Sequence, residues 1–431
     1  MRIKKGKVRK HHHRRKHQCM ISCIYTCLLL CLFSGPACIH NNTGQPKYHF
    51  NGKISEHVLR NYLSRSICFE QLCTPPPVPS KEHDEAYRDD LRLIQSIGAK
   101  FIGRSLSCRG EEDKLNDPEF LSFAKNIIDE IHAFDRDILF QAAISDAVSS
   151  KVEHIQIPER VFEAFGLPVK DRSFNYQAML HSSGLYKDWW GEECSVPDIT
   201  KMESKLWLYF LATNYIDAGF EGIHWGQVTL MAHDDPKLEH LSALLGMIRS
   251  YARTNARRRF ILNDAHAPGG GYLVNGRHLF DFNSSHLCIK ARTMVPMGGA
   301  LAEGYLDAIY NRSRGGISPS GWSCKSLPYL VAFDDSGISS DSCRPVNECC
   351  IWGYNEISWF SLKNEEEQEA WLEYAFNWIK KTDPNGYLQM PVACKVTDAK
   401  SSRRWYKANI LSPASPNGSG LEVRIKELWS P

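Results

Sequence analysis

Short runs of β-branched and aromatic residues alternate along the chain with longer segments in which apolar residues recur every three or four positions. The runs predict strands at 62–69, 100–106, 137–144, 220–227, 259–264, 304–309, 329–333 and 386–390. The periodic segments predict helices at 82–97, 118–134, 203–217, 236–256 and 365–381. This alternation is typical of βα units that surround a parallel sheet.

Strands of this number, spread over roughly 330 residues, favour an α/β fold of the (β/α)8 TIM-barrel type. The barrel would carry long βα-loop insertions at 145–202 and 265–303. A doubly wound open sheet is the alternative. That fold needs a glycine-rich phosphate turn after its first strand, where residues 70–75 read EQLCTP.

Charge divides the chain into two unlike parts. The formal net charge is +3, but nine Lys and Arg residues and no acid lie within residues 1–37, so the remainder carries −6. Because phosphate binding needs a local surplus of Lys and Arg, this acidic body argues against a nucleic-acid partner.

The basic segment is followed by an apolar, uncharged run at 19–33 and by small residues at Gly35 and Ala37. This order predicts a signal peptide over 1–37 and a secreted, extracytoplasmic protein. An uncleaved signal anchor over 19–39 is the alternative and gives the only expected membrane contact. The rest divides into a linker at 38–55, a barrel domain at 56–410 and a C-terminal tail at 411–431.

Cysteines are frequent in the exported part of the chain. Five of the 15 lie in or directly beside the leader and ten in the body, and an even number in an exported chain predicts disulfides whose pairing the sequence does not give. No CxxC pair occurs there, which argues against a structural zinc site.

Carboxylates that follow predicted strands are the candidate catalytic groups. In a barrel these positions lie at one end, where glycosidic hydrolysis would need one carboxyl to protonate the leaving oxygen and a second to attack the sugar or activate water. Asp264, Asp334, Asp335 and Glu356 stand at such positions. We expect Glu356 to be the acid/base and Asp264 the nucleophile or base.

Other polar and aromatic residues near the strand ends are candidates for binding a hydroxyl-rich ligand. Tryptophan rings can stack on sugar rings, and histidine and amide groups can hydrogen-bond hydroxyls. The candidate binding residues are Arg104, Gln141, His224, Trp225, Gln227, Asn263, His266, Trp322 and Trp352. Glu221, at the entrance of the fourth strand, is instead expected to form a buried structural ion pair.

A metal-dependent hydrolase is a further alternative, because His224 and His266 end adjacent predicted strands beside Asp264. Barrel amidohydrolases also need a His-x-His pair on their first strand, where residues 62–66 read YLSRS. We therefore expect neither a metal site nor a cofactor, and interpret both histidines as hydrogen-bonding residues.

Three segments carry a resemblance to known proteins: IHWGQ at 223–227, NDAH at 263–266 and WGYNE at 352–356. Over about 55–410 the chain resembles an uncharacterised group of exported (β/α)8-barrel proteins that are similar to glycoside hydrolases. Many such hydrolases carry an Asn-Glu pair at the end of strand four, where Gly226 and Gln227 stand here. The resemblance implies the fold and the compartment, and it transfers no catalytic residue.

The sequence thus predicts a secreted, glycoside-hydrolase-like barrel that acts on a carbohydrate through a carboxylate pair. A non-catalytic barrel that only binds glycans is the main alternative, because fold alone does not establish activity.

Overall fold

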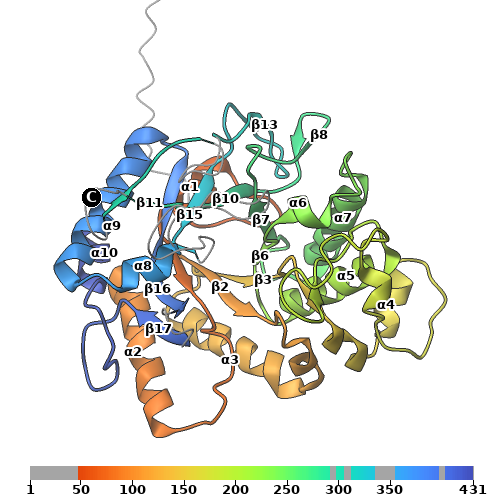
Figure 1. Cartoon of the computed structure of the whole chain (residues 1–431), viewed down its shortest axis with the longest axis horizontal. Helices are drawn as coiled ribbons and strands as arrows, with labels where there is room; N and C mark the ends of the chain where they lie inside the picture. The colour runs from red at the N-terminus through yellow and green to blue at the C-terminus, as the bar shows by residue number, and fades with distance from the viewer. Residues whose placement is uncertain (1–46, 292–297, 305–311, 335–354, 398–402, 431) are drawn as a thin grey trace, which may run out of the picture. The chain divides into compact units, whose positions relative to one another are not determined.

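Eight of the described strands form a closed parallel barrel in the computed structural model (Figure 1). The structure describes residues 47–291, 298–304, 312–334, 355–397 and 403–430. In order around the barrel the strands are β1 Ser66–Phe69, β2 Phe101–Ser107, β3 Leu139–Ala143, β6 Gly222–His224, β7 Leu262–His266, β10 Phe282–His286, β15 Tyr329–Ala332 and β16 Gly386–Thr397. Neighbours pair in parallel, and β1 pairs with β16 to close the sheet. The predicted (β/α)8 fold is confirmed.

Helices surround the barrel (Figure 1). The described helices are α1 Glu56–Leu63, α2 Lys81–Ile97, α3 Pro118–Phe134, α4 Glu159–Ala164, α5 Met202–Asp217, α6 Val228–Met231, α7 Glu239–Asn255, α8 Glu356–Ser361, α9 Glu365–Thr382 and α10 Glu422–Leu428. The five predicted helices correspond to α2, α3, α5, α7 and α9 and are confirmed. No described helix lies between β7 and β15, so the described parts of the β7–β10 and β10–β15 connections contain none.

Local sequence explains where these helices begin and end. The Asn364 side chain accepts a hydrogen bond from the Glu367 backbone, and the Glu367 side chain accepts one from the Asn364 backbone, which forms a capping box at the start of α9. Asp117 caps α3, whose first residue is Pro118. Gly98 ends α2 in the left-handed conformation, which glycine adopts without steric cost.

Two strand predictions need correction. Residues 62 and 63 belong to α1, so the first strand begins at Ser66 rather than at Tyr62. The sixth barrel strand is β10, inside the segment 265–303 that was expected to be a loop, and β10 pairs directly with β7 and β15. The predicted strand at 304–309 lies almost entirely outside the described residues.

The end of the barrel at which the strands begin is filled by its own apolar cluster. Tyr48, Phe50 and Ile54, from the segment expected to be a linker, are buried there with residues of α1. They pack on side chains at the strand starts, including Phe101 and Leu262. This packing closes one end of the barrel and leaves the opposite end, where the strands finish, for a site.

The shorter strands lie outside the barrel wall. β17 Arg403–Lys407 extends the sheet by antiparallel pairing with β16. Two-stranded pairs form between β4 Val148–Ser149 and β5 Cys194–Ser195 and between β11 Lys290–Ala291 and β12 Gly299–Ala300. A four-stranded sheet comprises β8 Leu273–Val274, β9 Arg277–His278, β13 Gly316–Ile317 and β14 Ser323–Cys324.

Residues 46–431 form one compact unit, which includes the segment expected to be a C-terminal tail. Helix α10 in that segment packs on α2, where Arg92 Nη1 and Nη2 donate to the Glu422 carboxylate at 2.6 and 2.7 Å. None of the described helices is long and apolar enough to cross a membrane. The leader, with its predicted signal peptide or 19–39 anchor, lies outside the described residues.

The described cysteines beyond the leader are all free thiols: Cys68, Cys73, Cys108, Cys194, Cys288, Cys324 and Cys394. The other three cysteines of the body, Cys343, Cys349 and Cys350, lie outside the described residues, as does Cys38 beside the leader. The structure therefore contains none of the predicted disulfides among the cysteines that it describes.

His132 on α3 makes stability sensitive to acid. Its ring packs edge-on against Phe140 at 5.5 Å between centroids, and its Nε2 lies 2.9 Å from the Ile138 carbonyl oxygen. Burial, aided by Arg257, lowers the pKa of His132 to about 4. The pKa of a histidine in the unfolded chain is about 6.5. The contribution of the neutral His132 ring to the free energy of unfolding is therefore fully present above that pH and declines as pH falls toward the folded pKa.

We therefore expect His132→Gln to lose less free energy of unfolding than the wild type between pH 7 and pH about 4. Urea denaturation of both proteins at the two pH values measures the difference. Equal losses in the two proteins would contradict the assignment.

Candidate active site

Asp264 lies at the centre of the polar residues at the carboxyl ends of the strands. It faces the barrel interior from β7 and is 1% exposed. The Gln141 side chain of β3 donates to its Oδ1 at 2.5 Å, and His224 Nδ1 of β6 lies 2.8 Å from its Oδ2. Since each oxygen has a hydrogen-bond partner, the carboxyl group is fixed in orientation.

Gln141 is itself held by its neighbours. Its Oε1 accepts a hydrogen bond from the Arg104 backbone at 3.3 Å. A Cβ on Gly103 would lie 3.1 Å from Gln141 Oε1 and 2.3 Å from Gln389 Nε2. Only glycine at 103 leaves room for both amides, which form a polar layer in the barrel with Ser66, the acceptor for Gln389 at 2.9 Å.

Asp334 is a second carboxyl group at this end, two residues after β15. Arg104 Nη2 and His286 Nδ1 lie 2.7 and 2.9 Å from its Oδ2. Burial alone would raise the pKa of Asp334, but Arg104 and His286 outweigh burial and hold the pKa well below its ordinary value. Asp334 is therefore ionised at neutral pH.

A backbone irregularity directs Arg104 toward Asp334. Arg104 has a φ of +57°, in the left-handed region that non-glycine residues rarely adopt. The pairing of β2 with β3 shifts register between Ile102 and Leu106, on either side of it. Such bulges redirect side chains and are frequent beside functional sites.

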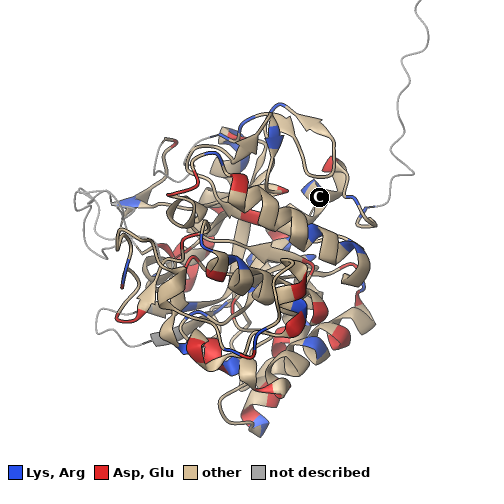
Figure 2. Cartoon of the chain, turned by 90° about the vertical axis from the view of Figure 1, so that its right-hand side faces the viewer, with Lys and Arg blue, Asp and Glu red and all other residues tan. Residues whose placement is uncertain are grey.

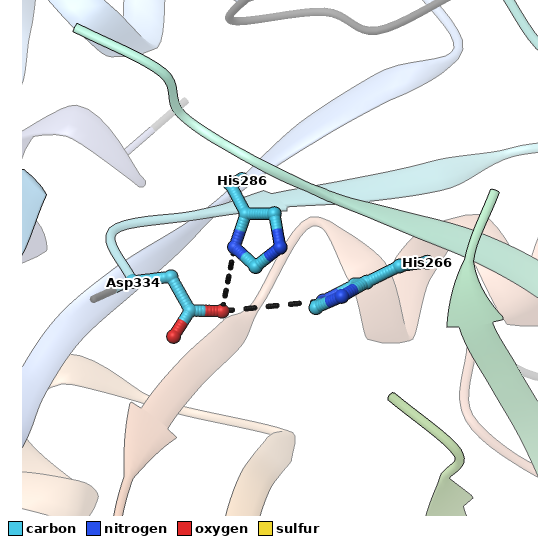
Figure 3. A group of neighbouring side chains, drawn as sticks. All are labelled: His266, His286 and Asp334. Atoms are coloured by element: carbon cyan, nitrogen blue, oxygen red, sulfur yellow. Dashed lines mark ion pairs between the residues drawn. The ribbon is translucent and has the colours of Figure 1, made fainter. Parts of the chain in front are cut away.

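Three imidazoles connect the two carboxylates. The His266 ring lies 4.9 Å from the His224 ring and 4.0 Å from the His286 ring, between centroids. Figure 3 shows His266 and His286 directed at Asp334, with His266 Nε2 3.9 Å from Asp334 Oδ2. Burial, together with the other two histidines, lowers the pKa of His266 well below its ordinary value, so its ring is neutral.

Asp146 is a further buried carboxyl group at this end, three residues beyond β3. Its Oδ1 lies against Gly226, where an added Cβ would come within 2.6 Å of it, and Oδ2 has no hydrogen-bond partner among the described residues. Burial raises the pKa of Asp146, although Arg109 opposes the shift. Trp190 of the 145–202 insertion donates from its indole to the Asp146 carbonyl at 3.1 Å.

Glu356 comes to the same end as the first residue of α8, and its side chain is fully buried. The neighbouring Ile357 backbone donates to the Asp334 carbonyl at 3.1 Å, which places the start of the helix beside the end of β15. The structure thus brings Glu356, Asp264 and Asp334 to one end of the barrel, together with Arg104, Gln141, His224 and His266. Gln227, half-buried after β6, belongs to the same end, where its backbone N–H hydrogen-bonds Asp146.

Several predicted binding residues do not reach this site. Trp225 follows the inward-facing His224, and Asn263 precedes the inward-facing Asp264, so both side chains point out of the barrel. There Trp225 is fully buried and donates to the Asn263 side chain at 2.9 Å. Trp322 donates to the Ile54 carbonyl at 3.1 Å, at the opposite end. These placements correct the expectation that the three residues contact a ligand. Trp352 and Asp335 lie outside the described residues.

The sequence interpretation missed His286, Asp146 and Gln389. His286 ends the unrecognised strand β10. Asp146 follows a predicted strand, so extending the search for carboxyl groups two residues past Ile144 would have found it. Gln389 lies within the predicted strand 386–390, where a polar residue in an otherwise apolar run was the available signal.

The expectation that the protein has no nucleic-acid partner stays a prediction. In the view of Figure 2, basic and acidic residues are interspersed along the ribbon. A second group of ionisable residues comprises His181 and Asp198, from the 145–202 insertion, and Asp234, which follows α6. His181 lines a cavity of about 410 Å³ with Lys187 and Lys201.

No family model matches the chain, and no curated protein matches it. Among solved structures, it is similar to a GH27 β-L-arabinopyranosidase from Geobacillus stearothermophilus in complex with arabinose (9% identity, 77% of this chain, 73% of that chain, TM-score 0.35). It is also similar to a debranching enzyme from Nostoc punctiforme (11% identity, 52% of each chain, TM-score 0.32). A third structure is a putative α-N-acetylgalactosaminidase from Bacillus halodurans (12% identity, 48% and 50%, TM-score 0.26).

The chain thus spans about half the length of the last two enzymes. Similarities with TM-scores below 0.5 assign no activity to this chain. The site's own residues must therefore carry any functional argument.

Proposed function

We propose that this protein binds a carbohydrate at the carboxyl end of its barrel and hydrolyses a glycosidic bond there. The observation that carries this proposal is that three buried carboxyl groups, those of Asp264, Glu356 and Asp146, lie at this end in unlike surroundings. Glycosidic hydrolysis requires such a division, with one carboxyl ionised and another protonated.

Asp264 suits the role of nucleophile or base. Its two oxygens are oriented by Gln141 and His224, and it projects from a rigid strand. Asp334 is less suited to either role, because Arg104 and His286 both contact its Oδ2. We assign Asp334 to holding Arg104 and His286 in position.

Glu356 and Asp146 are the two candidates for the acid. Glu356 is fully buried. Burial raises the pKa of Asp146, and a group that donates a proton near neutral pH needs such a raised pKa. The His224 ring and the neutral His266 ring supply hydrogen-bonding groups for sugar hydroxyls. We place this activity outside the cell, as the predicted leader implies.

Leaving-group dependence distinguishes the two acids. The secreted protein and its Glu356→Gln and Asp146→Asn variants are assayed on the substrate found in a glycan and glycoside panel. We expect the variant that lacks the acid to lose about a hundredfold or more in rate on alkyl glycosides, and far less on activated aryl glycosides, which leave without protonation.

Two results would overturn parts of this proposal. Equal losses on both substrate types in both variants would remove the acid role from Glu356 and Asp146. Binding of a glycan without hydrolysis of any panel member would favour the non-catalytic barrel instead.

A further inference from the structure

We propose that His266, His286 and Asp334 form a binding site for a divalent transition-metal ion, with Zn²⁺ or Co²⁺ as the probe. The three residues lie at the ends of the adjacent strands β7, β10 and β15. One ligand atom from each lies within 4.8 Å of the others, and all three residues are buried. Figure 3 shows the two rings and the carboxylate directed at one another.

His266 is the residue that ordinary packing does not explain. Neither of its ring nitrogens hydrogen-bonds any residue that the structure describes, although the side chain is only 8% exposed. A buried polar atom without a partner is costly, so such atoms in native proteins are usually satisfied by a water or a ligand. The two nitrogens therefore indicate that something else binds here.

The spacing fits a metal ion better than a direct contact. His266 Nε2 and Asp334 Oδ2 are 3.9 Å apart, too far for a hydrogen bond. Ligands placed about 2.0–2.1 Å from a tetrahedral Zn²⁺ lie about 3.3–3.4 Å from each other. His286 Nδ1 lies 2.9 Å from the same oxygen. To reach the ligand separation of about 3.3–3.4 Å, the two atoms would need to move apart by only a few tenths of an ångström.

The chemistry of the three ligands selects the kind of ion. Two imidazoles and one carboxylate suit Zn²⁺ and related transition metals, whereas Ca²⁺ and Mg²⁺ prefer oxygen ligands. Three protein ligands leave a fourth position for water or a substrate oxygen. The cluster of His181, Asp198 and Asp234 offers one imidazole, whose Nδ1 is already 2.9 Å from an exposed Asp234.

Arg104 opposes a cation at this site. Its Nη2 lies 2.7 Å from the Asp334 oxygen that a metal would take, so binding requires Arg104 to move away from Oδ2. This competition supplies a test of the geometry. We expect Arg104→Met to bind Zn²⁺ at least about tenfold more tightly than the wild type, because the competing charge is removed.

The experiment measures metal rather than activity, so its outcome is independent of the proposed hydrolysis. The full chain and its variants are dialysed against Zn²⁺, and bound metal is counted by mass spectrometry. Because the leader contains three consecutive histidines at 11–13, which bind metal themselves, the count is taken as a difference between proteins. His286→Gln and Asp334→Asn should each bind about one equivalent less than the wild type.

His181→Gln is the matched control, since it removes a histidine of the other cluster. We expect it to retain the wild-type count, and thermal unfolding verifies that each variant is folded. Substitution with Co²⁺ gives a second measurement, because a tetrahedral site produces intense visible absorption that His286→Gln should lose. Equal metal in the wild type and His286→Gln, loss only in His181→Gln, or unchanged affinity in Arg104→Met would each overturn the proposal.

Discussion

Replacing Asp264 with asparagine is expected to lower kcat/KM for the hydrolysed glycoside by about a thousandfold or more. Asparagine keeps the size of the side chain but has no carboxylate to attack a sugar or activate water. It also replaces one of the two oxygens that Gln141 and His224 contact with an NH2 group, which cannot accept a hydrogen bond. Initial rates at several substrate concentrations give kcat and KM separately.

A matched control is available on helix α5. Asp217 is an exposed aspartate at the end of this helix. Its two oxygens accept from the hydroxyl of Tyr251 on α7 at 2.8 Å, so its contact lies between two outer helices. Asp217→Asn should leave kcat/KM unchanged within a factor of about two. A loss of activity as large in Asp217→Asn as in Asp264→Asn would show that the effect is not specific to the site.

The second large effect concerns stability. Glu221→Ala is expected to cost about 3–5 kcal/mol in the free energy of unfolding. The Glu221 side chain is 1% exposed and contacts Arg257 Nη2 at 2.5 Å and Arg258 Nε at 3.5 Å. Removing it takes the nearer carboxylate away from Arg258, which is 9% exposed, and leaves only the Asp137 carboxylate, at 4.0 Å, among the ion pairs of that guanidinium in the described residues. The sequence-based expectation of a buried structural pair at Glu221 is confirmed.

Denaturant unfolding of Glu221→Ala beside Glu303→Gln measures this prediction. Glu303 pairs with Arg312 at 2.7 Å, but both side chains are more than a third exposed. Exposed pairs contribute about 0–1 kcal/mol, so the control variant should change little. Similar losses in the two variants would contradict the argument that burial makes the Glu221 pair important.

The elements with strong apolar patterns could be predicted from the sequence. The apolar stripe of 365–381 gives helix α9, and the apolar run 329–333 gives strand β15. Strand β10 could not be found in this way, because its residues 282–286 read FNSSH, and serine and asparagine have low strand propensity. Two of its polar residues have partners: Asn283 donates to the Gly270 carbonyl and the Ser313 hydroxyl, and His286 contacts Asp334.

The site was predicted in part for a related physical reason. Residues alternate between the inside and the outside of a strand, so of two neighbours such as Asn263 and Asp264 only one can face the site. When both neighbours are polar, the sequence does not show which of the two side chains faces the inside of the barrel. Trp322 illustrates a second limit, because a loop between strands can lie at either end of the barrel. The contact of Trp322 with Ile54 places it at the end without the site.

His286 depends on both limits. It ends a strand that the pattern did not predict, and its partner Asp334 lies 48 positions further along the chain. Only the closure of the barrel brings the two together. Long-range pairing of this kind is set by the topology of the whole sheet and has no local signature.

The position of a bound glycan tests the central claim most directly. A crystal structure is determined for the Asp264→Asn variant in complex with the glycan that the wild type hydrolyses. We predict a sugar ring at the carboxyl end of the barrel, with its scissile glycosidic bond beside residue 264 and its hydroxyls on His224 and His266. A glycan bound elsewhere, such as in the cavity beside His181 and Lys201, would contradict the account.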